Sequence, residues 1–371
     1  MKKFLSLVLA LVMTMSLVTV SAGAKDFTDS SKIDYSEAVD VMSAVKVIDG
    51  YTDGSFNPTA TLTRGAAAKI ICNLILGPTT ASALVADAAP YKDVPTTNVF
   101  AGYIAYCQKE GIISGYADGT FKPANSLTGY AFMKMLLGAL GYDAEVEGYT
   151  GPNWSINVAK RALNIGLADD LIGDFNGVKA VNREEACLYA LNTLTADMVE
   201  YDAKTSVSAG NTTVVIAGSK AKEMVNNGNS DGKVFTKDGV MQFAEKYFDN
   251  LSVKKGEDDF GRPSNVWKLK AEEIGTYSNT PDATYTKKVE AGDIYKDLSL
   301  GSTIEASDVT VYVNGVEKTA AEIDIKKGSD VAIGKAVDTN GNGVLTEVFY
   351  DDDADTVTIT QILTYIGEIN K

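Results

Sequence analysis

The sequence predicts a multidomain α+β protein with an all-α N-terminal part and a mainly β C-terminal part. A helix–loop–helix pattern recurs through residues 25–202, and alternating β-type residues with hairpin turns dominate residues 203–371. Residues 1–24 precede the fold as a leader segment. The β-rich part can divide into two small domains near residue 300. Three helical repeats are expected at about 26–78, 90–143 and 150–202.

The leader has the features of a secretory signal peptide in the usual order. Lys2 and Lys3 give a positive start, an apolar run too short to favour a membrane span follows, and Ala22-Gly23-Ala24 offers a small-x-small cleavage site. We expect cleavage after Ala24 and export to the cell surface; a retained N-terminal anchor is the alternative. The sequence carries no lipid-anchor cysteine and no LPxTG-like sorting signal, so attachment to the cell wall is expected to be non-covalent.

The composition excludes some ligands and some chemistry. A formal net charge of −15 argues against nucleic acid, and an anionic wall polymer would have to be bound by a few positioned cations. The absence of histidine excludes Ser-His and Cys-His nucleophile systems and removes the commonest zinc ligand. Cys72, Cys107 and Cys187 lie in apolar runs without CxxC spacing, so we expect them to be buried; an intermolecular disulfide is the alternative.

An internal repeat organises the helical part. The segment Gly-Tyr-Thr-Asp-Gly-Ser-Phe-Asn-Pro at residues 50–58 returns as Gly-Tyr-Ala-Asp-Gly-Thr-Phe-Lys-Pro at residues 115–123. A weaker third copy keeps Gly173 and Phe175 in matching positions but lacks the Asp and Pro of the other two loops. An aromatic residue opens each copy: Tyr35, Phe100 and Trp154.

Each copy predicts two helices joined by a tight loop. In the first copy, apolar residues from Tyr35 to Val45 recur at three- and four-residue steps, and Thr63 is a good N-cap for the second helix. Thr128 and Asn182 hold the same cap position in the other copies. One helix pair buries little apolar surface, so the copies are expected to pack together. The remaining helices are predicted at 104–109, 132–140, 158–165 and 186–194.

These repeats resemble the S-layer homology (SLH) domain. The shared pattern is an aromatic residue, then G-I-I-S-G-Y-x-D-G-T-F-x-P, then T-R, and it is clearest in Gly111–Pro123 and Gly50–Arg64. Val181–Ala186 is similar to the family's T-R-A-E segment, and Phe27–Asp29 and Tyr91–Val94 are similar to its start. The resemblance covers about half of the chain. It implies a pseudo-threefold helical bundle that binds secondary cell wall polysaccharide, often through a ketal-pyruvylated terminal sugar, in grooves between repeats.

The resemblance also implies the binding residues. The family's arginine falls on Arg64 and Arg183, where a guanidinium fork can bind a pyruvate carboxylate and a helix N-terminus adds a favourable dipole. A cation in the first turn of a helix opposes that dipole, which favours a functional reason for both arginines. The opening aromatics Tyr35, Phe100 and Trp154 are more typical of helix-core anchors than of sugar platforms, and Trp154 is included as a candidate platform. The loop residues expected to approach the ligand are Gly50, Tyr51, Asp53, Gly54, Gly115, Tyr116, Asp118 and Gly119. Their alternative role is to form the turn alone.

Two departures from the family pattern limit the expected number of sites. The second copy has Gly129 where the arginine belongs, and the first copy has Gly65-Ala66 after its arginine. At most two of the grooves therefore keep the arginine that the family uses to bind an acidic sugar. Lys69 and Lys134 lie five residues past the arginine position and are expected on the solvated helix surface; a contribution of charge to the site is the alternative.

Patterns typical of strands follow the repeats. Residues 207–216 alternate like a strand, and residues 240–248 can form a short helix. Val309–Val313 followed by Asn314-Gly315 is a strong signal for a two-residue hairpin. Residues 260–285 resemble a region that follows SLH triplets in other clostridial-type surface proteins, which names no activity. Further strands are expected at 331–337, 345–350 and 357–366.

No metal, cofactor or catalytic residue is predicted. Asp338–Gly343 resembles the front of an EF-hand loop, but Phe349 stands where the bidentate Glu belongs, so a hairpin turn is the preferred interpretation. Carboxylates are too numerous for a glycosidase pair to be selected. An acidic cluster is expected to be a solvated loop, with weak calcium binding as the alternative: Asp351, Asp352, Asp353 and Asp355.

The sequence therefore predicts a non-enzymatic, exported surface or S-layer protein that its repeats anchor to the cell wall. Its partners would be a secondary cell wall polysaccharide or another peptidoglycan-linked glycan, and further copies of the chain in a surface lattice. Nucleic acid is excluded, and so is a membrane after signal cleavage. Two alternatives stay open, each with its site in residues 203–371: an SLH-anchored enzyme, and a surface module that binds calcium or another ligand.

Overall fold

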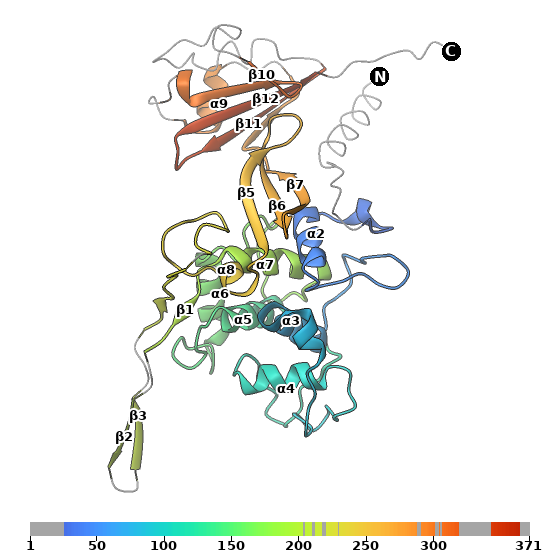
Figure 1. Cartoon of the computed structure of the whole chain (residues 1–371), viewed down its shortest axis with the longest axis vertical. Coiled ribbons are helices and arrows are strands. Elements are labelled where there is room, and N and C mark those ends of the chain that lie inside the picture. The colour runs from blue at the N-terminus through green and yellow to red at the C-terminus, as the bar shows by residue number, and fades with distance from the viewer. Residues whose placement is uncertain are drawn as a thin grey trace. The chain divides into compact units, whose positions relative to one another are not determined.

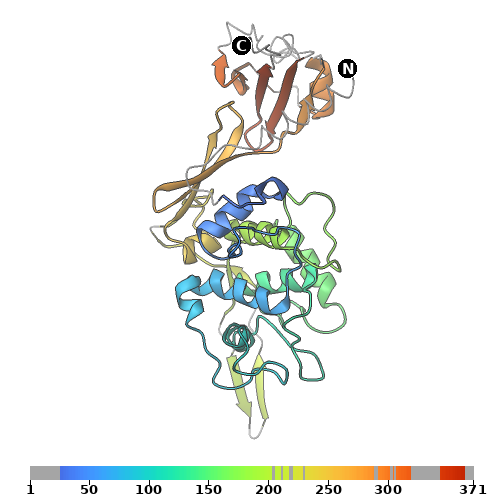
Figure 2. The same cartoon turned by 90° about the vertical axis from the view of Figure 1, so that its right-hand side faces the viewer.

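The computed structural model describes residues 26–202, 205–209, 212–216, 220–228, 230–287, 291–300, 304, 306–318 and 343–363 (Figures 1 and 2). These residues form two compact units. The N-terminal unit holds the described residues up to Val253 and also Trp267–Ile274; the C-terminal unit holds Lys254–Val266 and the described residues from Gly275 onward. The predicted leader, the strand at 331–337 and the calcium-like segment up to residue 342 lie outside the described residues. The predicted domain limits stay predictions.

Residues 26–202 contain the three predicted helix pairs. After the short turn η1 (Ser30–Lys32), the pairs are α2 (Ser36–Ala44) with α3 (Arg64–Ser82), α4 (Ala101–Lys109) with α5 (Gly129–Ala139), and α6 (Trp154–Asn164) with α7 (Arg183–Thr195). The second helix of each pair packs against the first helix of another pair: α3 on α4, α5 on α6, and α7 on α2. Each repeat is therefore completed by a neighbour.

The predicted N-cap residues begin the second helices. The Thr63 hydroxyl accepts the N–H of Ala66, and Asn182 forms a reciprocal capping box with Glu185. Thr128 occupies the same position before α5, but its hydroxyl makes no capping hydrogen bond. The prediction for Thr128 is therefore right for the boundary and wrong for the side-chain bond.

A closed ring of backbone hydrogen bonds joins the three repeats. The N–H of Leu62 donates to the carbonyl of Val181 at 2.8 Å, that of Val181 to Leu127 at 2.9 Å, and that of Leu127 to Leu62 at 2.9 Å. Each of these residues lies two positions before the first residue of a second helix, and each is 2% exposed. The ring satisfies backbone groups that would otherwise be buried without a partner.

Short strands and one helix follow the repeats in the N-terminal unit. Strand β1 (Val199–Glu200) pairs antiparallel with β4 (Lys222–Glu223), and β2 (Thr205–Ala209) pairs antiparallel with β3 (Thr212–Ile216). The single strand predicted over 207–216 is therefore wrong, because the Gly-Asn dipeptide in this run is a hairpin turn signal. The predicted short helix is confirmed as α8 (Phe243–Tyr247).

A three-stranded sheet runs in the order β5 (Leu251–Glu257), β6 (Pro263–Leu269) and β7 (Glu272–Ser278). The division between the two units falls within these strands. On the part that belongs to the N-terminal unit, Trp267 is 1% exposed and donates its indole N–H to Glu37 of α2 at 2.6 Å. This bond joins the Trp267 end of β6 to the first repeat within the N-terminal unit.

A five-stranded sheet forms the C-terminal unit. Its order is β10 (Val316–Lys318), β9 (Val309–Val313), β12 (Thr356–Leu363), β11 (Val344–Asp351) and β8 (Ala283–Tyr285), and only the pair β12–β9 is parallel. The core includes Ile294 of α9 (Ala291–Asp297), Ile304, Val311, Val348 and Ile359. A short turn, η2 (Ala306–Asp308), precedes β9.

The hairpin predicted at Asn314-Gly315 is confirmed. Both residues have positive φ, 48° and 76°, as a two-residue turn of this kind requires. Val313 and Val316 then face each other in the antiparallel register of β9 and β10. The strands predicted at 345–350 and 357–366 are present as β11 and β12, within the described residues.

A buried ion-pair network lies in the C-terminal unit. The Arg262 side chain is 2% exposed, and it contacts Glu347 from Nε at 2.6 Å and Asp258 from Nη1 at 3.1 Å. The hydroxyl of Thr360 also donates to Glu347, at 3.2 Å. Both carboxylates are buried as well, with side chains 1% exposed for Asp258 and 8% for Glu347. The network links the turn between β5 and β6 to β11 and β12.

The mixture of helices and several sheets agrees with the predicted α+β class. Among the described residues, no helix combines the length and the apolar character needed to cross a membrane.

Candidate functional site

Arg64 reaches from the first repeat into the loop of the second. We call such a contact, between the N-terminus of one second helix and the loop of another repeat, a seam. In this first seam Arg64 donates from Nε to the carbonyl oxygen of Phe121 at 2.7 Å and from Nη2 to that of Ser114 at 3.2 Å. Its guanidinium carbon lies 4.3 Å from the ring centroid of Phe121 and 5.1 Å from that of Tyr116.

Arg183 makes the same set of contacts from the third repeat to the loop of the first. In this second seam Nε donates to the carbonyl of Phe56 at 2.9 Å and Nη2 donates to that of Asp49 at 2.7 Å. The guanidinium carbon lies 4.8 Å from the ring centroids of both Tyr51 and Phe56. The two seams therefore present the same chemical arrangement.

Each arginine seam has an open side. Tyr51 is 50% exposed and Tyr116 is 44% exposed, and both arginines are half-buried. Considering only the described residues, Nη1 of neither arginine makes a hydrogen bond. A free guanidinium edge therefore lies beside an exposed aromatic ring, which is an arrangement suited to a sugar that carries a carboxylate.

The carbonyl partners explain how a cation is tolerated in the first turn of a helix. Such a charge opposes the helix dipole, but here two carbonyl oxygens from another repeat accept its protons. Burial lowers the pKa of the Arg64 guanidinium, and the nearby phenols of Tyr116 and Tyr91 partly oppose this shift. An arginine still keeps its charge at neutral pH.

The loop glycines have structural reasons for their identity. A Cβ added to Gly50 would lie 2.5 Å from the Phe27 ring, and one added to Gly115 would lie 2.3 Å from the Tyr91 ring. Gly54 and Gly119 have φ of +84° and +80°, a conformation that favours glycine. These four residues shape the loops, and ligand contact by them stays a prediction.

The side chains of Asp53 and Asp118 stabilise the loop turns in which these residues lie. One carboxylate oxygen of Asp53 accepts both the N–H and the hydroxyl of Ser55, and Asp118 does the same with Thr120. These hydrogen bonds lower the pKa of both aspartates. Turn formation, the alternative role given to them above, is observed in the structure.

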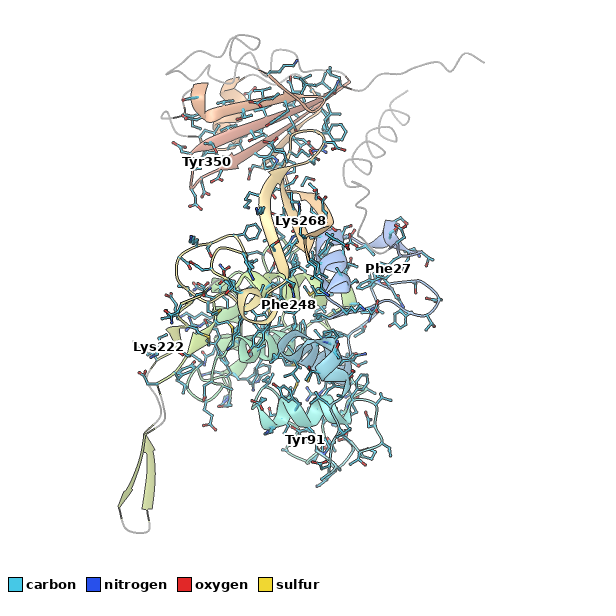
Figure 3. The ribbon with its side chains drawn as sticks, in the orientation of Figure 1. Phe27, Tyr91, Lys222, Phe248, Lys268 and Tyr350 are labelled. Atoms are coloured by element: carbon cyan, nitrogen blue, oxygen red, sulfur yellow. The ribbon has the colours of Figure 1, made fainter. Side chains whose placement is uncertain are left out.

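Two further aspartates clamp the loops, and the sequence interpretation did not assign them a role. Asp29 accepts the N–H groups of Phe56 and Asn57, both at 2.8 Å, and Asp93 accepts those of Phe121 and Lys122, both at 2.7 Å. Phe27 and Tyr91, labelled in Figure 3, pack nearby, each with its ring centroid 5.2 Å from the loop phenylalanine. The recurring Phe-Thr-Asp and Tyr-Lys-Asp openings were the available signal.

The clamps predict a pH-dependent stability of the loops. Burial raises the pKa of Asp29 and Asp93, but the backbone N–H bonds outweigh it and leave both pKa values lowered. The stabilisation is therefore complete above about pH 4, the unfolded-state pKa, and is lost as the pH falls through the folded-state values. We expect Asp29→Asn plus Asp93→Asn to melt below wild type at pH 6, with a difference that shrinks below pH 4. A difference that stays constant from pH 6 to pH 2.5 would contradict this assignment.

The third seam has no arginine and is filled by an aromatic side chain. The N–H groups of Gly129 and Tyr130 donate to the carbonyls of Lys179 and Gly177, at 3.0 and 2.8 Å. The Tyr130 ring lies 5.9 Å from Phe175, and a Cβ on Gly177 would lie 2.1 Å from it. The cavity beside this seam is only about 50 Å³.

Trp154 lies in this third seam rather than beside either arginine. Its ring centroid is 6.5 Å from that of Tyr130, and Lys134 Nζ lies 5.7 Å from the indole. Burial lowers the pKa of Lys134. The expectation that Lys134 is solvated is therefore wrong, because its side chain packs over Trp154; Lys69 is exposed, as expected. Phe100, another opening aromatic, contacts the first seam at Gly65, where a Cβ would lie 2.5 Å from its ring.

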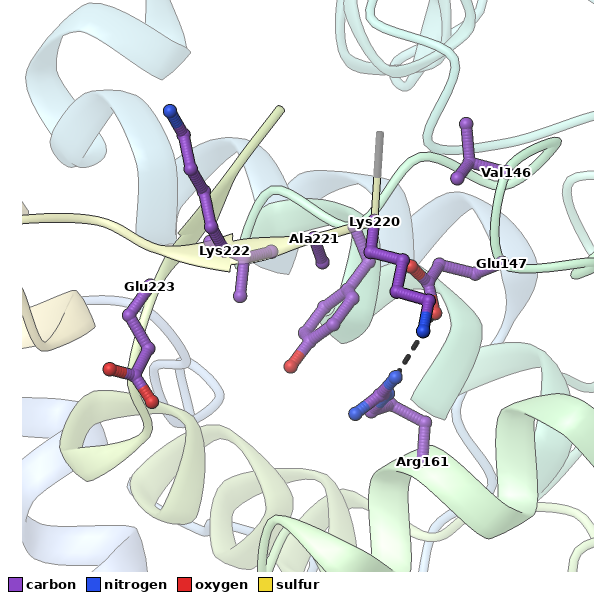
Figure 4. Close-up of a pocket in the computed structure, with 9 residues that line it drawn as sticks. Val146, Glu147, Arg161, Lys220, Ala221, Lys222 and Glu223 are labelled. Carbon is purple, nitrogen blue, oxygen red and sulfur yellow. Dashed lines mark hydrogen bonds and ion pairs between the residues drawn. The ribbon is translucent and has the colours of Figure 1, made fainter. Parts of the chain in front are cut away.

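A larger hollow of about 880 Å³ lies between the region around α6 and the strand pair β1–β4 (Figure 4). Arg161 and Glu147 form an ion pair there at 3.2 Å, and Arg161 also lies 5.1 Å from the ring centroid of Tyr142. Lys220, Lys222 and Glu223 complete its charged lining. None of the residues predicted to bind glycan lines this hollow.

The acidic cluster of the C-terminal unit lies at the surface. Asp351, Asp352 and Asp353 are exposed, with carboxylate oxygens within 4.8 Å of one another. Asp355 accepts the hydroxyl of Tyr350. These features agree with the solvated loop that the sequence predicts.

Comparison with known proteins identifies the repeats. A model of the S-layer homology domain matches residues 26–68 and 90–129. The surface layer protein of Brevibacillus choshinensis is 27% identical over 358 residues, which cover 86% of this chain and 31% of that protein. The cell surface protein of Thermoanaerobacter kivui is 24% identical over 381 residues, covering 95% and 46%. The cellulosome-anchoring protein of Acetivibrio thermocellus is 36% identical over 81 residues, covering 22% and 18%. The chain spans less than half the length of these relatives.

The helix pairs form a repeat protein in which the second helix of each copy packs against the first helix of another copy. The matches show that this chain is a cell-wall-associated surface protein of the Firmicute type that carries S-layer homology domains. The family model covers the first two repeats, and the third is seen in the structure through α6, α7 and the second seam.

Proposed function

We propose that the repeats attach this protein non-covalently to the cell wall by binding a secondary cell wall polysaccharide. An acidic sugar, such as one with a ketal-linked pyruvate, would occupy the Arg64 and Arg183 seams. The observation that supports this most is the duplicated geometry of an arginine fixed by two loop carbonyls beside an exposed tyrosine. Nη1 would bind the carboxylate, and the tyrosine ring would pack against the sugar.

The overall charge of the chain makes local cations necessary. With a formal net charge of −15, the long-range field repels an anionic polymer. Recognition of such a polymer therefore depends on short-range contacts at the few cations that face open seams. Because Tyr130 fills the third seam, the bundle would offer two acidic-sugar sites.

We infer a pseudo-threefold arrangement of the repeats, with the two sites related by that symmetry. The ring formed by Leu62, Leu127 and Val181 supports it, and so does the cyclic packing of α3 on α4, α5 on α6 and α7 on α2. Equivalent positions then face outward around one axis. A polymer with several acidic sugars could engage both arginine sites at once.

The remainder of the chain would act without catalysis. We propose that the β-rich part serves spacing or self-assembly at the cell surface. The names of the surface layer and cellulosome-anchoring relatives support attachment and assembly.

The test is retention of the mature chain, residues 25–371, on purified wall sacculi. We expect retention on untreated sacculi and loss on sacculi from which mild acid has removed the pyruvyl groups. Equal retention on both would contradict the acidic-sugar site. Chromatography of the supernatant is expected to show no released glycan or peptide, whereas time-dependent release would indicate an enzyme.

A further inference from the structure

Two of the three cysteines meet where α3 of the first repeat packs against α4 of the second. Cys72 lies on α3 of the first repeat, Cys107 lies on α4 of the second, and their sulfur atoms are 3.6 Å apart. Both residues are 0% exposed. Each sulfur also faces a backbone carbonyl of the opposite element, Cys72 that of Tyr103 at 3.6 Å and Cys107 that of Ala68 at 3.7 Å. The two thiols are thus in van der Waals contact within the α3–α4 packing.

Because the two cysteines belong to different repeats, a bond between them would cross-link the first repeat to the second. Helix α3 begins at Arg64, and α4 leads into the loop that carries Ser114 and Tyr116. A bond between Cys72 and Cys107 would therefore join the two sides of the seam that hold the Arg64 site. Cys187 is also buried, but it lies on α7, which packs against α2.

We propose that Cys72 and Cys107 form an intramolecular disulfide that locks the first repeat to the second after export. In the reaction the two thiols lose two protons and two electrons in all, and the S–S bond forms. A small-molecule disulfide is the oxidant, and it is reduced to two thiols in successive exchange steps. The inference rests on the juxtaposition of the sulfurs and on export, and it does not depend on the proposed glycan site.

The burial of the pair sets when the bond can form. The hydrogen bond with Cys72, together with burial, raises the pKa of the Cys107 thiol, and the thiolate is the form that attacks a disulfide. Once α3 and α4 have packed together, oxidation of the thiols and reduction of the disulfide both require the two helices to separate. The cross-link therefore forms while the chain folds, and it persists afterwards.

The experiment refolds the chain of residues 25–371 from denaturant in glutathione buffer, then blocks free thiols with N-ethylmaleimide in denaturant and measures the intact mass. We expect one adduct per monomer in the oxidised protein, on Cys187, and three after reduction with dithiothreitol. Proteolysis should give a single cross-linked peptide pair that contains Cys72 and Cys107. The oxidised form should melt roughly 5–15 °C above the reduced form.

Matched variants distinguish this pair from random oxidation. Cys187→Ala should give no adduct when oxidised, and Cys72→Ala or Cys107→Ala should each give two. Three adducts on oxidatively refolded wild type would overturn the proposal, and so would a cross-link to Cys187 or a covalent dimer. The wild-type measurement decides the matter even if a substitution impairs folding. Loss of wall binding with the disulfide intact would count against the glycan site alone.

Discussion

Replacing Arg262 by alanine is expected to lower the free energy of unfolding of the C-terminal unit by about 3–5 kcal/mol. The substitution leaves the carboxylates of Asp258 and Glu347 buried without the guanidinium that lies 3.1 and 2.6 Å from them. Each carboxylate must then either bind a proton or be hydrated by water that enters the core, and both changes lower the stability of the folded unit. Urea unfolding of the chain, monitored by far-UV circular dichroism, measures the loss.

A matched control separates this effect from a loss of surface charge. Lys254 lies on β5 and is exposed, so Lys254→Ala should change stability by no more than about 0.5 kcal/mol. A loss below about 1 kcal/mol for Arg262→Ala would show that water or relaxation compensates both carboxylates.

Replacing Arg64 and Arg183 together by alanine is expected to abolish retention on wall sacculi. A charge-assisted hydrogen bond contributes about 1.5–3 kcal/mol, so each arginine should account for roughly 10- to 100-fold in affinity. The two single variants should keep partial binding, because the polymer can still engage the other seam. A sedimentation assay with increasing amounts of sacculi measures the change.

Two further variants control for charge and for folding. Lys69→Ala plus Lys160→Ala removes the same charge from exposed helix positions and should bind like wild type. Tyr51→Ala plus Tyr116→Ala keeps both arginines and their hydrogen bonds to the loop carbonyls, and removes only the exposed ring beside each guanidinium. It should weaken binding less than the arginine double variant does. Undiminished binding by the arginine double variant, with the fold intact by circular dichroism, would end the acidic-sugar proposal.

Local features of the fold were predictable because they depend on neighbours in sequence. Apolar periodicity located the six helices of the repeats, and Thr63 and Asn182 marked two of their starts. The Asn314-Gly315 turn was equally clear, because its positive φ angles favour those residue types.

Contacts between distant segments were not predictable in the same way. Sequence singled out Arg64 and Arg183 but could not show that each serves the loop of a different repeat. Lys134 appeared solvated because its partner, Trp154, lies in the next repeat. Arg262 gave no signal at all, since Glu347 is far along the chain and pairs with it only once the sheet has formed.

The ring of Leu62, Leu127 and Val181 fixes the number of copies that this module can contain. In an open solenoid a repeat can be added at either end, because each copy contacts only its neighbours. Here the last copy donates to the second and the first donates to the last, so no free end exists for extension. A fourth repeat could be inserted only by breaking one of the buried hydrogen bonds of this ring. Under the proposed function, a chain with more sites for the wall would therefore need a second complete set of three repeats.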